Sequence, residues 1–224
     1  MRERAGHVWW WAFVTVGVIH LVGQLAALGQ VADATKPALM PLLVGWFVSV
    51  TSRGRLRTLL VVGLGLSWCG DLALMRSGEA WFLTGLGAFL LAQLAYAVAF
   101  WPSRARSVLS RPALVVPYAA VLVGLLAILW TDLGDLRVPV MAYAIVIIAM
   151  AVLATGLGPT VAVGALLFVL SDALIALDTV ADLHRLPAHG FWVMLTYLGA
   201  QALIARGVQQ HLHRPATATA TPDV

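Results

Sequence analysis

Apolar segments long enough to cross a lipid bilayer recur along nearly the whole chain. A transmembrane helix needs about 20 mostly apolar residues, and an open strand leaves backbone groups unpaired in lipid, so helices are expected. The second of eight such segments is short and is expected to use Lys36 and Thr51 at its ends. The eight are Val8–Leu28, Pro37–Val50, Leu56–Met75, Trp81–Trp101, Ala113–Thr131, Val138–Gly156, Pro159–Asp178 and Gly190–Gln210. They predict an all-α, polytopic membrane protein of about eight transmembrane helices.

Composition and turn signals support this fold class. Charged residues make up 11% of the chain, and the mean hydropathy is +0.92, whereas soluble domains carry about 25% charged residues. We expect residues 1–213 to form a single transmembrane domain and the low-complexity residues 214–224 to form a disordered cytoplasmic tail. Turn signals separate the spans at Lys36-Pro37, Ser52–Gly54, Arg111-Pro112, Gly158-Pro159 and Leu186-Pro187.

Positive charge is distributed unequally between the predicted loops. Of the 14 Lys and Arg residues, ten fall on the side of the N-terminus when eight spans alternate, and four fall on the other side. Under the positive-inside rule both termini are therefore cytoplasmic. The net charge of +4 is thereby explained by topology, so no nucleic-acid partner is expected. The excess of Arg over Lys favours a bacterial inner membrane.

This orientation can be tested with reporter fusions. A reporter joined after Arg57 or after Arg111 is expected to report a cytoplasmic position, because both residues belong to the basic side. A reporter joined after Asp135 is expected to report a position outside the cytoplasm. An external signal from a fusion at the C-terminus would contradict the assignment.

Two acidic residues lie inside apolar segments, where a carboxylate costs several kcal/mol on insertion scales. Asp71 stands in Gly70-Asp71-Leu72-Ala73-Leu74, and Asp172 stands in Ser171-Asp172-Ala173-Leu174-Ile175. Both lie at similar depth, roughly 20 Å from the cytoplasmic end of their spans at about 1.5 Å per residue. We interpret them as functional, the alternative being structural hydrogen bonding. The two similar segments suggest a 4+4 parallel pseudo-repeat, with chance resemblance as the alternative.

Further polar residues are predicted at the depth of these carboxylates. They form pairs with helical spacing on single spans, and each pair shares a helix face. Lys36 lies at the outer mouth of the second span. Each residue alone is more often an interhelical hydrogen-bond partner than a ligand, but together they predict a polar pocket open to the non-cytoplasmic side. The pairs are His20 and Gln24, Gln93 and Tyr96, and Tyr197 and Gln201.

The order of these motifs resembles the lysoplasmalogenase (YhhN-like) family over about residues 36–207. The motifs are Lys36-Pro37, Gly70-Asp71-x-x-Leu74, Gly85-x-x-x-Phe89-x-x-x-Gln93-x-x-Tyr96, Gly164-Ala165-x-x-Phe168-x-x-Ser171-Asp172 and Tyr197-x-x-x-Gln201-x-Leu203-Ile204. One departure is Gln93, a position commonly occupied by His in this family, so the side chain there has no titratable group. The resemblance implies hydrolysis of the vinyl-ether bond of lysoplasmalogens to a fatty aldehyde and glycerophosphoethanolamine or glycerophosphocholine.

The polar residues fit this chemistry. A vinyl ether hydrolyses by protonation of its β-carbon, which requires a general acid that holds its proton near pH 7 and a negative group that stabilises the cation. Two carboxylates in a low-dielectric pocket can supply both, so Asp71 and Asp172 are the predicted catalytic pair. Lys36 is expected to bind the phosphate. The other predicted substrate-binding residues are Gln93, Tyr96, Tyr197, Gln201 and His20. No metal and no cofactor are expected.

Three other functions remain open at this stage. A zinc-dependent lipid amidase would need several histidines inside the spans, but only His20 lies well within one, and the single Cys69 excludes a multi-cysteine site. A proton-coupled transporter of small molecules would use the two acids as a relay. A non-catalytic membrane scaffold would make both acids structural.

Overall fold

The computed structural model describes residues 2–179 and 186–213, and within them it contains eight α-helices and no strand. Short 3₁₀ segments occupy several of the connections, among them the long one between α4 and α5. The predicted all-α fold is therefore confirmed. The helices are α1 Arg2–Leu25, α2 Gly29–Val50, α3 Arg55–Leu74, α4 Glu79–Phe100, α5 Val116–Leu129, α6 Arg137–Ala154, α7 Pro159–Thr179 and α8 His189–His213.

Seven segments of the described chain, containing every helix except α2, are long and apolar enough to span a membrane. Helix α2 carries Asp33 and Lys36 in its first half, which lowers its hydropathy. It nevertheless packs along α1 in an antiparallel hairpin, with Gly23 of α1 against Val31 and Gly6 of α1 against Val50. Because α2 packs along α1 from Val31 to Val50, we count it as the eighth helix of the bundle.

The predicted break at Lys36-Pro37 is wrong, because Pro37 and Pro41 both lie inside α2. A proline removes the hydrogen bond from its own nitrogen to the carbonyl four residues earlier, so Pro41 leaves the carbonyl of Pro37 free. The indole Nε1 of Trp68 on α3 donates to that oxygen at 2.8 Å. Helix α2 thus continues through its prolines with a partner supplied by the neighbouring helix.

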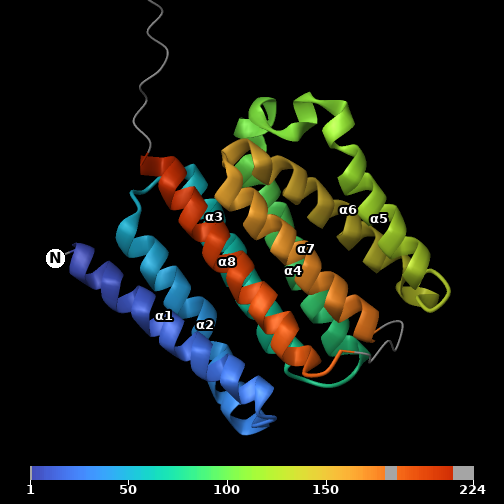
Figure 1. Ribbon diagram of the computed structural model, residues 1–224, viewed down its shortest axis with the longest axis horizontal. Helices are drawn as coiled ribbons and strands as arrows, with labels where there is room; N and C mark the ends of the chain where they lie inside the picture. Colours follow the sequence, from blue (N-terminus) through green and yellow to red (C-terminus); the bar gives the residue numbers. More distant parts are fainter. Residues whose placement is uncertain (1, 180–185, 214–224) are drawn as a thin grey trace, which may run out of the picture.

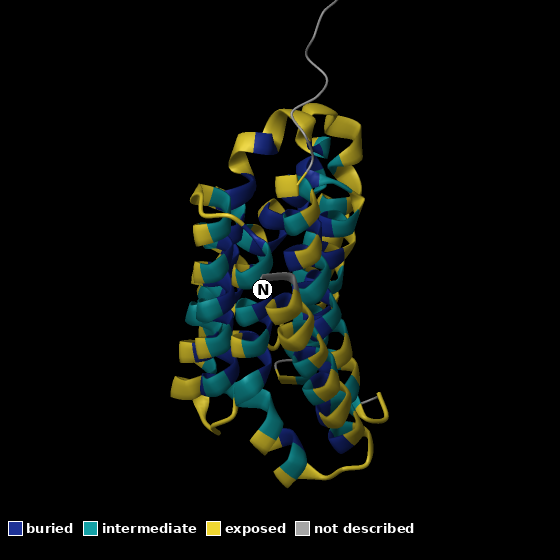
Figure 2. Ribbon diagram, turned by 90° about the vertical axis from the view of Figure 1, so that its left-hand side faces the viewer, coloured by how far each residue is buried: buried dark blue, intermediate teal, exposed yellow. Residues whose placement is uncertain are grey.

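Consecutive helices pack against each other as hairpins, most closely α1 with α2, α3 with α4 and α7 with α8, and together these pairs form the bundle (Figure 1). Helices α1 and α2 lie on one side, α3, α4, α7 and α8 occupy the centre, and α5 lies beside α6 at the opposite edge. Exposed residues cover the outward faces of the helices, and buried residues face the interior (Figure 2). The centre of the bundle is therefore built from the four helices that carry most of the predicted site residues.

Close helix contacts in this centre depend on glycine. A Cβ on Gly70 of α3 would lie 2.6 Å from the ring of Phe89 on α4, and a Cβ on Gly164 of α7 would lie 2.8 Å from the backbone nitrogen of Ile204 on α8. Hydrogen in place of a side chain lets these helices approach each other. The approach brings the polar residues of α3, α4, α7 and α8 together.

Tryptophan and arginine side chains stack at the ends of the helices. The guanidinium carbon of Arg76 lies 4.5 Å from the ring centroid of Trp81, and that of Arg104 lies 4.9 Å from Trp101. Arg137 and Trp130 form a similar pair. Such pairs suit the interface between lipid and water. Residues 214–224, the predicted disordered tail, lie outside the described residues.

Candidate active site

Asp71 lies on the last turn of α3 and is buried, with 4% of its surface exposed. The hydroxyl of Tyr197 on α8 donates a hydrogen bond to Asp71 Oδ2 at 2.7 Å. Both residues were predicted site residues from distant parts of the chain. The contact between α3 and α8 therefore joins the first predicted acid to a predicted tyrosine.

Asp172, on α7, has a tyrosine partner of its own. The hydroxyl of the buried Tyr143 on α6 donates to Asp172 Oδ2. Asp172 is only half-buried, in contrast to Asp71. Tyr143 was not among the predicted site residues, although a single tyrosine in the apolar segment of α6 was the signal that could have identified it.

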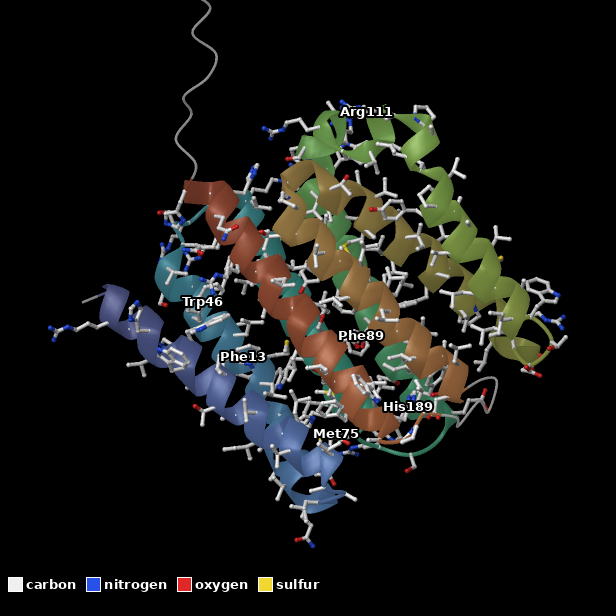
Figure 3. All side chains as sticks on the ribbon, in the orientation of Figure 1. Phe13, Trp46, Met75, Phe89, Arg111 and His189 are labelled. Carbon is white, nitrogen blue, oxygen red and sulfur yellow. The ribbon has the colours of Figure 1, made fainter. Side chains whose placement is uncertain are left out.

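Tyr197, the partner of Asp71, belongs to an aromatic cluster. Phe89, Phe168 and Tyr197 contact one another edge to face, with ring centroids 5.6 to 6.3 Å apart. Phe89 lies inside the bundle, away from its ends, which are marked by Met75 and His189 at one end and Arg111 at the other (Figure 3). No hydrogen bond joins the two carboxyl groups within the described residues, but they lie close enough for their charges to interact.

A third polar pair lies one helical turn deeper than Tyr197. The hydroxyl of Tyr96 on α4 donates to Gln201 Oε1 on α8 at 2.9 Å. Ser67, one turn before Asp71 on α3, is fully buried and lies close enough to the Tyr96 hydroxyl to interact with it, but its own hydroxyl reaches full hydrogen-bond geometry with no described residue. Gln201 Nε2 likewise reaches full hydrogen-bond geometry with no described residue, although Gln201 lies close enough to the Tyr197 hydroxyl to interact with it. Buried polar atoms of this kind are normally satisfied by protein or ordered water, so this part of the site is suited to bind water.

Gln93 lies between the Asp172–Tyr143 pair and the Tyr96–Gln201 pair. It is fully buried on α4, one turn from Tyr96, and it lies close enough to the Tyr143 hydroxyl to interact with it. Neither atom of its amide reaches hydrogen-bond geometry with any described residue. Since an amide both donates and accepts, Gln93 can bind a polar group lying between Tyr143 and Tyr96.

His20 lies elsewhere in the bundle. Its Nδ1 lies 2.9 Å from Thr35 Oγ1 and 3.1 Å from the Ala32 carbonyl oxygen, both on α2. Its fully buried Nε2 has no partner within the described part of the chain. The structure thus places His20 in the α1–α2 hairpin, where it lies near the charges of Lys36 and Asp33 rather than beside Asp71 or Asp172.

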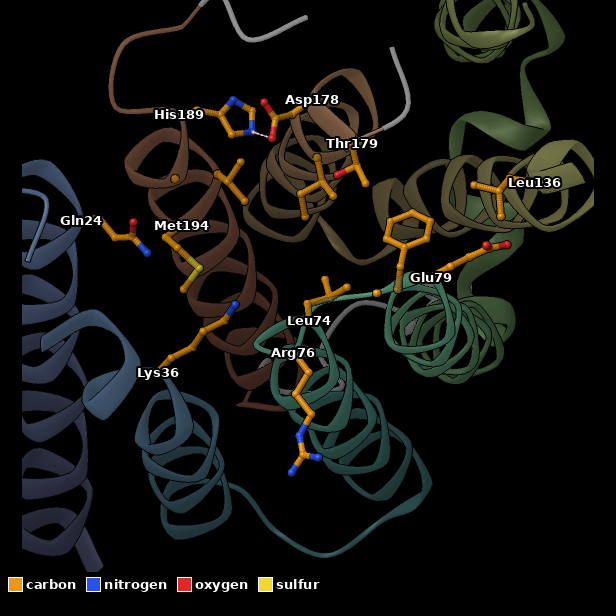
Figure 4. Close-up of a pocket in the computed structure, with 15 residues that line it drawn as sticks. Gln24, Lys36, Leu74, Arg76, Glu79, Leu136, Asp178, Thr179, His189 and Met194 are labelled. Atoms are coloured by element: carbon orange, nitrogen blue, oxygen red, sulfur yellow. Dashed lines mark ion pairs between the residues drawn. The ribbon is translucent and has the colours of Figure 1, made fainter. Parts of the chain in front are cut away.

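A pocket of about 600 Å³, here called the mouth pocket, opens at the end of the bundle where α3 and α7 finish and α4 and α8 begin. The side chain of Lys36 points into it toward Met194, and Gln24 reaches it from α1 (Figure 4). Its charged lining also includes Arg76, Glu79, and the ion pair between His189 Nε2 and Asp178 Oδ2 at 3.8 Å. The pocket offers both signs of charge to a ligand.

Two smaller cavities have Asp172 in their lining, and the first of them borders the mouth pocket. The first, of about 60 Å³, shares Leu74, Phe82 and Ile175 with the mouth pocket, and Tyr143 and Asp172 also line it. The second, of about 50 Å³, lies beyond Asp172 between α5, α6 and α7. Asp172 therefore lines both of these cavities, whereas Asp71 lines neither.

The described residues contain no group of three His, Cys, Asp or Glu side chains arranged to hold a metal ion. The polar centre consists instead of carboxyl, phenol, amide and hydroxyl groups. Such groups can donate, accept and transfer protons, which suits acid–base chemistry.

The fold and its long apolar helices define a polytopic helical membrane protein with a polar centre inside its bundle. Residues 31–208 match the model of the YhhN family, and the chain belongs to this family. The resemblance inferred from the sequence motifs is thereby confirmed. No solved structure matches the chain.

Curated relatives carry the name lysoplasmalogenase. The proteins of that name from Mycobacterium bovis and Mycobacterium tuberculosis are each 36% identical over 162 residues, which cover 69% of this chain and 61% of the relative. The chain thus spans about three fifths of the length of these two proteins. The lysoplasmalogenase TMEM86B of Homo sapiens is 33% identical over 164 residues, which cover 72% of this chain and 68% of the human protein.

Proposed function

We propose that this protein is a membrane hydrolase that cleaves the vinyl-ether bond of lysoplasmalogens. The products are a fatty aldehyde and glycerophosphoethanolamine or glycerophosphocholine. The observation that carries the proposal is the position of Asp172, a tyrosine-bound acid inside an apolar bundle, in a cavity that borders a charged pocket. The name shared by the curated relatives supports the same substrate class.

Asp172 is the proposed general acid, because it lines the cavities that a substrate can reach. Its proton passes to the β-carbon of the vinyl ether, and the double-bond electrons form the new C–H bond. The resulting oxocarbenium ion is attacked at its other carbon by water, whose proton returns to the Asp172 carboxylate. The hemiacetal then releases the glycerol hydroxyl and the aldehyde, so one water molecule is consumed for each bond cleaved. General acid catalysis of this kind contributes about 10²- to 10⁴-fold to a rate.

Asp71 is the proposed negative group that stabilises the cation. It is held by Tyr197 and interacts with Asp172 through charge. Two ionised carboxylates would repel each other strongly in this apolar interior, so we propose that the pair holds about one proton near neutral pH. One carboxyl group then donates while the other remains negative.

The attacking water is proposed to be held by the amide and hydroxyl groups that lie between the Asp172–Tyr143 pair and the Tyr96–Gln201 pair. Gln93 lies beside Tyr143, and Gln201 and Ser67 carry buried polar atoms without partners among the described residues. An amide at position 93 can orient water or a substrate oxygen without taking up a proton. Tyr96 holds Gln201 in place through its hydrogen bond.

The headgroup is proposed to bind in the mouth pocket. Lys36 is directed into the pocket and can meet the phosphate as a point charge. Glu79 lines the same pocket and can attract the ammonium group of ethanolamine or choline. His20 would act on this subsite only indirectly, through Lys36. A zwitterionic headgroup therefore matches both signs of charge in the pocket.

The proposed location is a bacterial inner membrane with both termini in the cytoplasm. The starts of α1 and α3 and the end of α8 lie at the end of the bundle opposite the mouth pocket (Figure 1). Arginines gather at that end, so the positive-inside rule directs the mouth pocket away from the cytoplasm. The proposed reaction uses no cofactor and no nucleic acid.

Mass spectrometry of the purified protein with lysoplasmalogen tests the function. We expect a fatty aldehyde from the vinyl ether and none from the saturated ether analogue, which lacks the double bond that accepts the proton. Turnover is expected to survive extensive chelation, because the proposed acids are carboxyl groups. Substrate binding without aldehyde release would contradict the proposal and favour transport. Loss of activity on chelation would favour the zinc-dependent alternative.

A further inference from the structure

Helix α5 buries a smaller share of its residues against the bundle than the other candidate membrane spans do. In its most apolar 18-residue window only 6% of residues are buried, against 61% in the corresponding window of α6. It lies at the edge of the bundle, beside α6 and α7 (Figure 1). One face of α5 is therefore open to lipid, while the other face closes a seam.

This seam, here called the α5 seam, is apolar along its length and ends at the candidate acid. Leu122, Leu125 and Leu126 line it from α5, and Ala144 and Ala173 line it from α6 and α7. Asp172 and Tyr143 are shared between the cavity of the seam and the cavity that borders the mouth pocket. The acid–tyrosine pair thus lies between the leucine-lined seam and a second small apolar cavity, which in turn borders the charged mouth pocket.

We propose that the hydrocarbon chain of the lipid substrate lies in the α5 seam, with its first carbons beside Asp172 and its headgroup in the mouth pocket. This inference rests on the proposed function, in which the reacting double bond joins the chain to the glycerol. The hydrocarbon chain and the headgroup must then extend from the reacting double bond in different directions. A charged pocket on one side of Asp172 and a leucine-lined seam on the other fit the two halves.

The size of the cavities also fits a chain that stays partly in the bilayer. The cavities beside Asp172 have volumes of about 60 and 50 Å³, which is room for only the first carbons of a chain. The rest would lie along α5, where Val121 and Ile128 are exposed. Apolar side chains and lipid tails are equally apolar, so the substrate reaches Asp172 sideways without leaving an apolar environment.

Two tryptophan variants of α5 test the inference kinetically. Leu125→Trp fills the seam, whereas Val123→Trp places the same side chain at a residue that is 65% exposed and outside the seam. We expect Leu125→Trp to raise KM for a long-chain lysoplasmalogen roughly tenfold or more, the effect of displacing about one or two methylene groups from an apolar site. Turnover of a short-chain analogue and the activity of Val123→Trp are expected to stay near wild type. Equal effects of both variants on both substrates would overturn the inference.

A binding measurement separates this inference from the proposed function. The probe is a saturated alkyl-ether lysophosphatidylethanolamine with a diazirine in the middle of its chain, which the proposed reaction cannot cleave. We expect photolabelled peptides from residues 116–129 and 137–154, and weaker labelling of these peptides in Leu125→Trp. Labelling spread evenly over all helices would overturn the seam as a chain site. Labelling at the seam without aldehyde release from lysoplasmalogen by the wild-type protein would contradict the proposed reaction but support the α5 seam as a binding site for a lipid chain.

Discussion

Replacing Asp172 with asparagine is expected to lower turnover by about 10³-fold, within the range that general acid–base catalysis contributes. Asparagine keeps the shape of the side chain and accepts the hydrogen bond from Tyr143, but it has no acidic proton to give. The measurement is aldehyde release in detergent, together with thermal unfolding of the same preparation. Asp71→Asn is expected to cause a comparable loss, because it removes the negative partner of the pair.

The control for this prediction is an acid outside the bundle. Asp132 is exposed between α5 and α6, and Asp132→Asn is expected to leave turnover and unfolding temperature unchanged. The double variant of Asp71 and Asp172 is expected to be little worse than either single variant, because residues that act as a unit are not additive. Near-full activity in either single variant, with the protein folded, would make that residue a structural partner of its tyrosine.

Adding one methyl group at Gly164 is expected to lower the thermal stability of the protein more than any of the other substitutions proposed above. In Gly164→Ala the new Cβ would lie 2.8 Å from the Ile204 nitrogen and 2.9 Å from the Ala200 carbonyl oxygen. Both atoms belong to the backbone of α8, so the two helices must move apart, at a cost of about 1–3 kcal/mol for overpacking. Because α8 carries Tyr197 and Gln201, turnover is expected to fall together with stability. Thermal unfolding in detergent measures the first effect and aldehyde release the second.

Gly87 on α4 is the matched control, because a Cβ there would have no neighbour within 4 Å. Gly87→Ala is expected to be neutral or to stabilise the protein by up to about 1 kcal/mol, since alanine favours helix more than glycine does. Equal destabilisation by both substitutions would show that the α7–α8 contact is not as close as the structure has it.

Much of the polar centre could be predicted because polar residues in an apolar span are conspicuous. Asp71, Tyr197, Tyr96 and Gln201 were all selected for that reason, and they form two hydrogen-bonded pairs. Tyr143 was missed because nothing in a single sequence shows that α6 lies beside α7 at Asp172. The pairing of each acid with its own tyrosine depends on these helix contacts.

The start of α2 could not be predicted for a related reason. Proline after a lysine indicated a break, but the carbonyl left free by Pro41 finds Trp68 on α3, which only the folded bundle supplies. His20 was selected by depth, yet Thr35 and Ala32 hold it in the α1–α2 hairpin. Depth along a helix follows from the sequence, whereas the face that meets a given neighbour does not. The 4+4 relation between the two halves stays a prediction.

The most direct test of the central proposal is turnover of lysoplasmalogen in deuterated water, with the aldehyde analysed by mass spectrometry. If Asp172 protonates the β-carbon, each aldehyde carries one deuterium on the carbon next to its carbonyl, and the reaction is slower than in ordinary water. Unlabelled aldehyde kept in the same solvent corrects for exchange after release. The Asp172→Asn variant is expected to form almost no labelled product. Aldehyde without deuterium, or labelled aldehyde formed at an unchanged rate by this variant, would contradict the account.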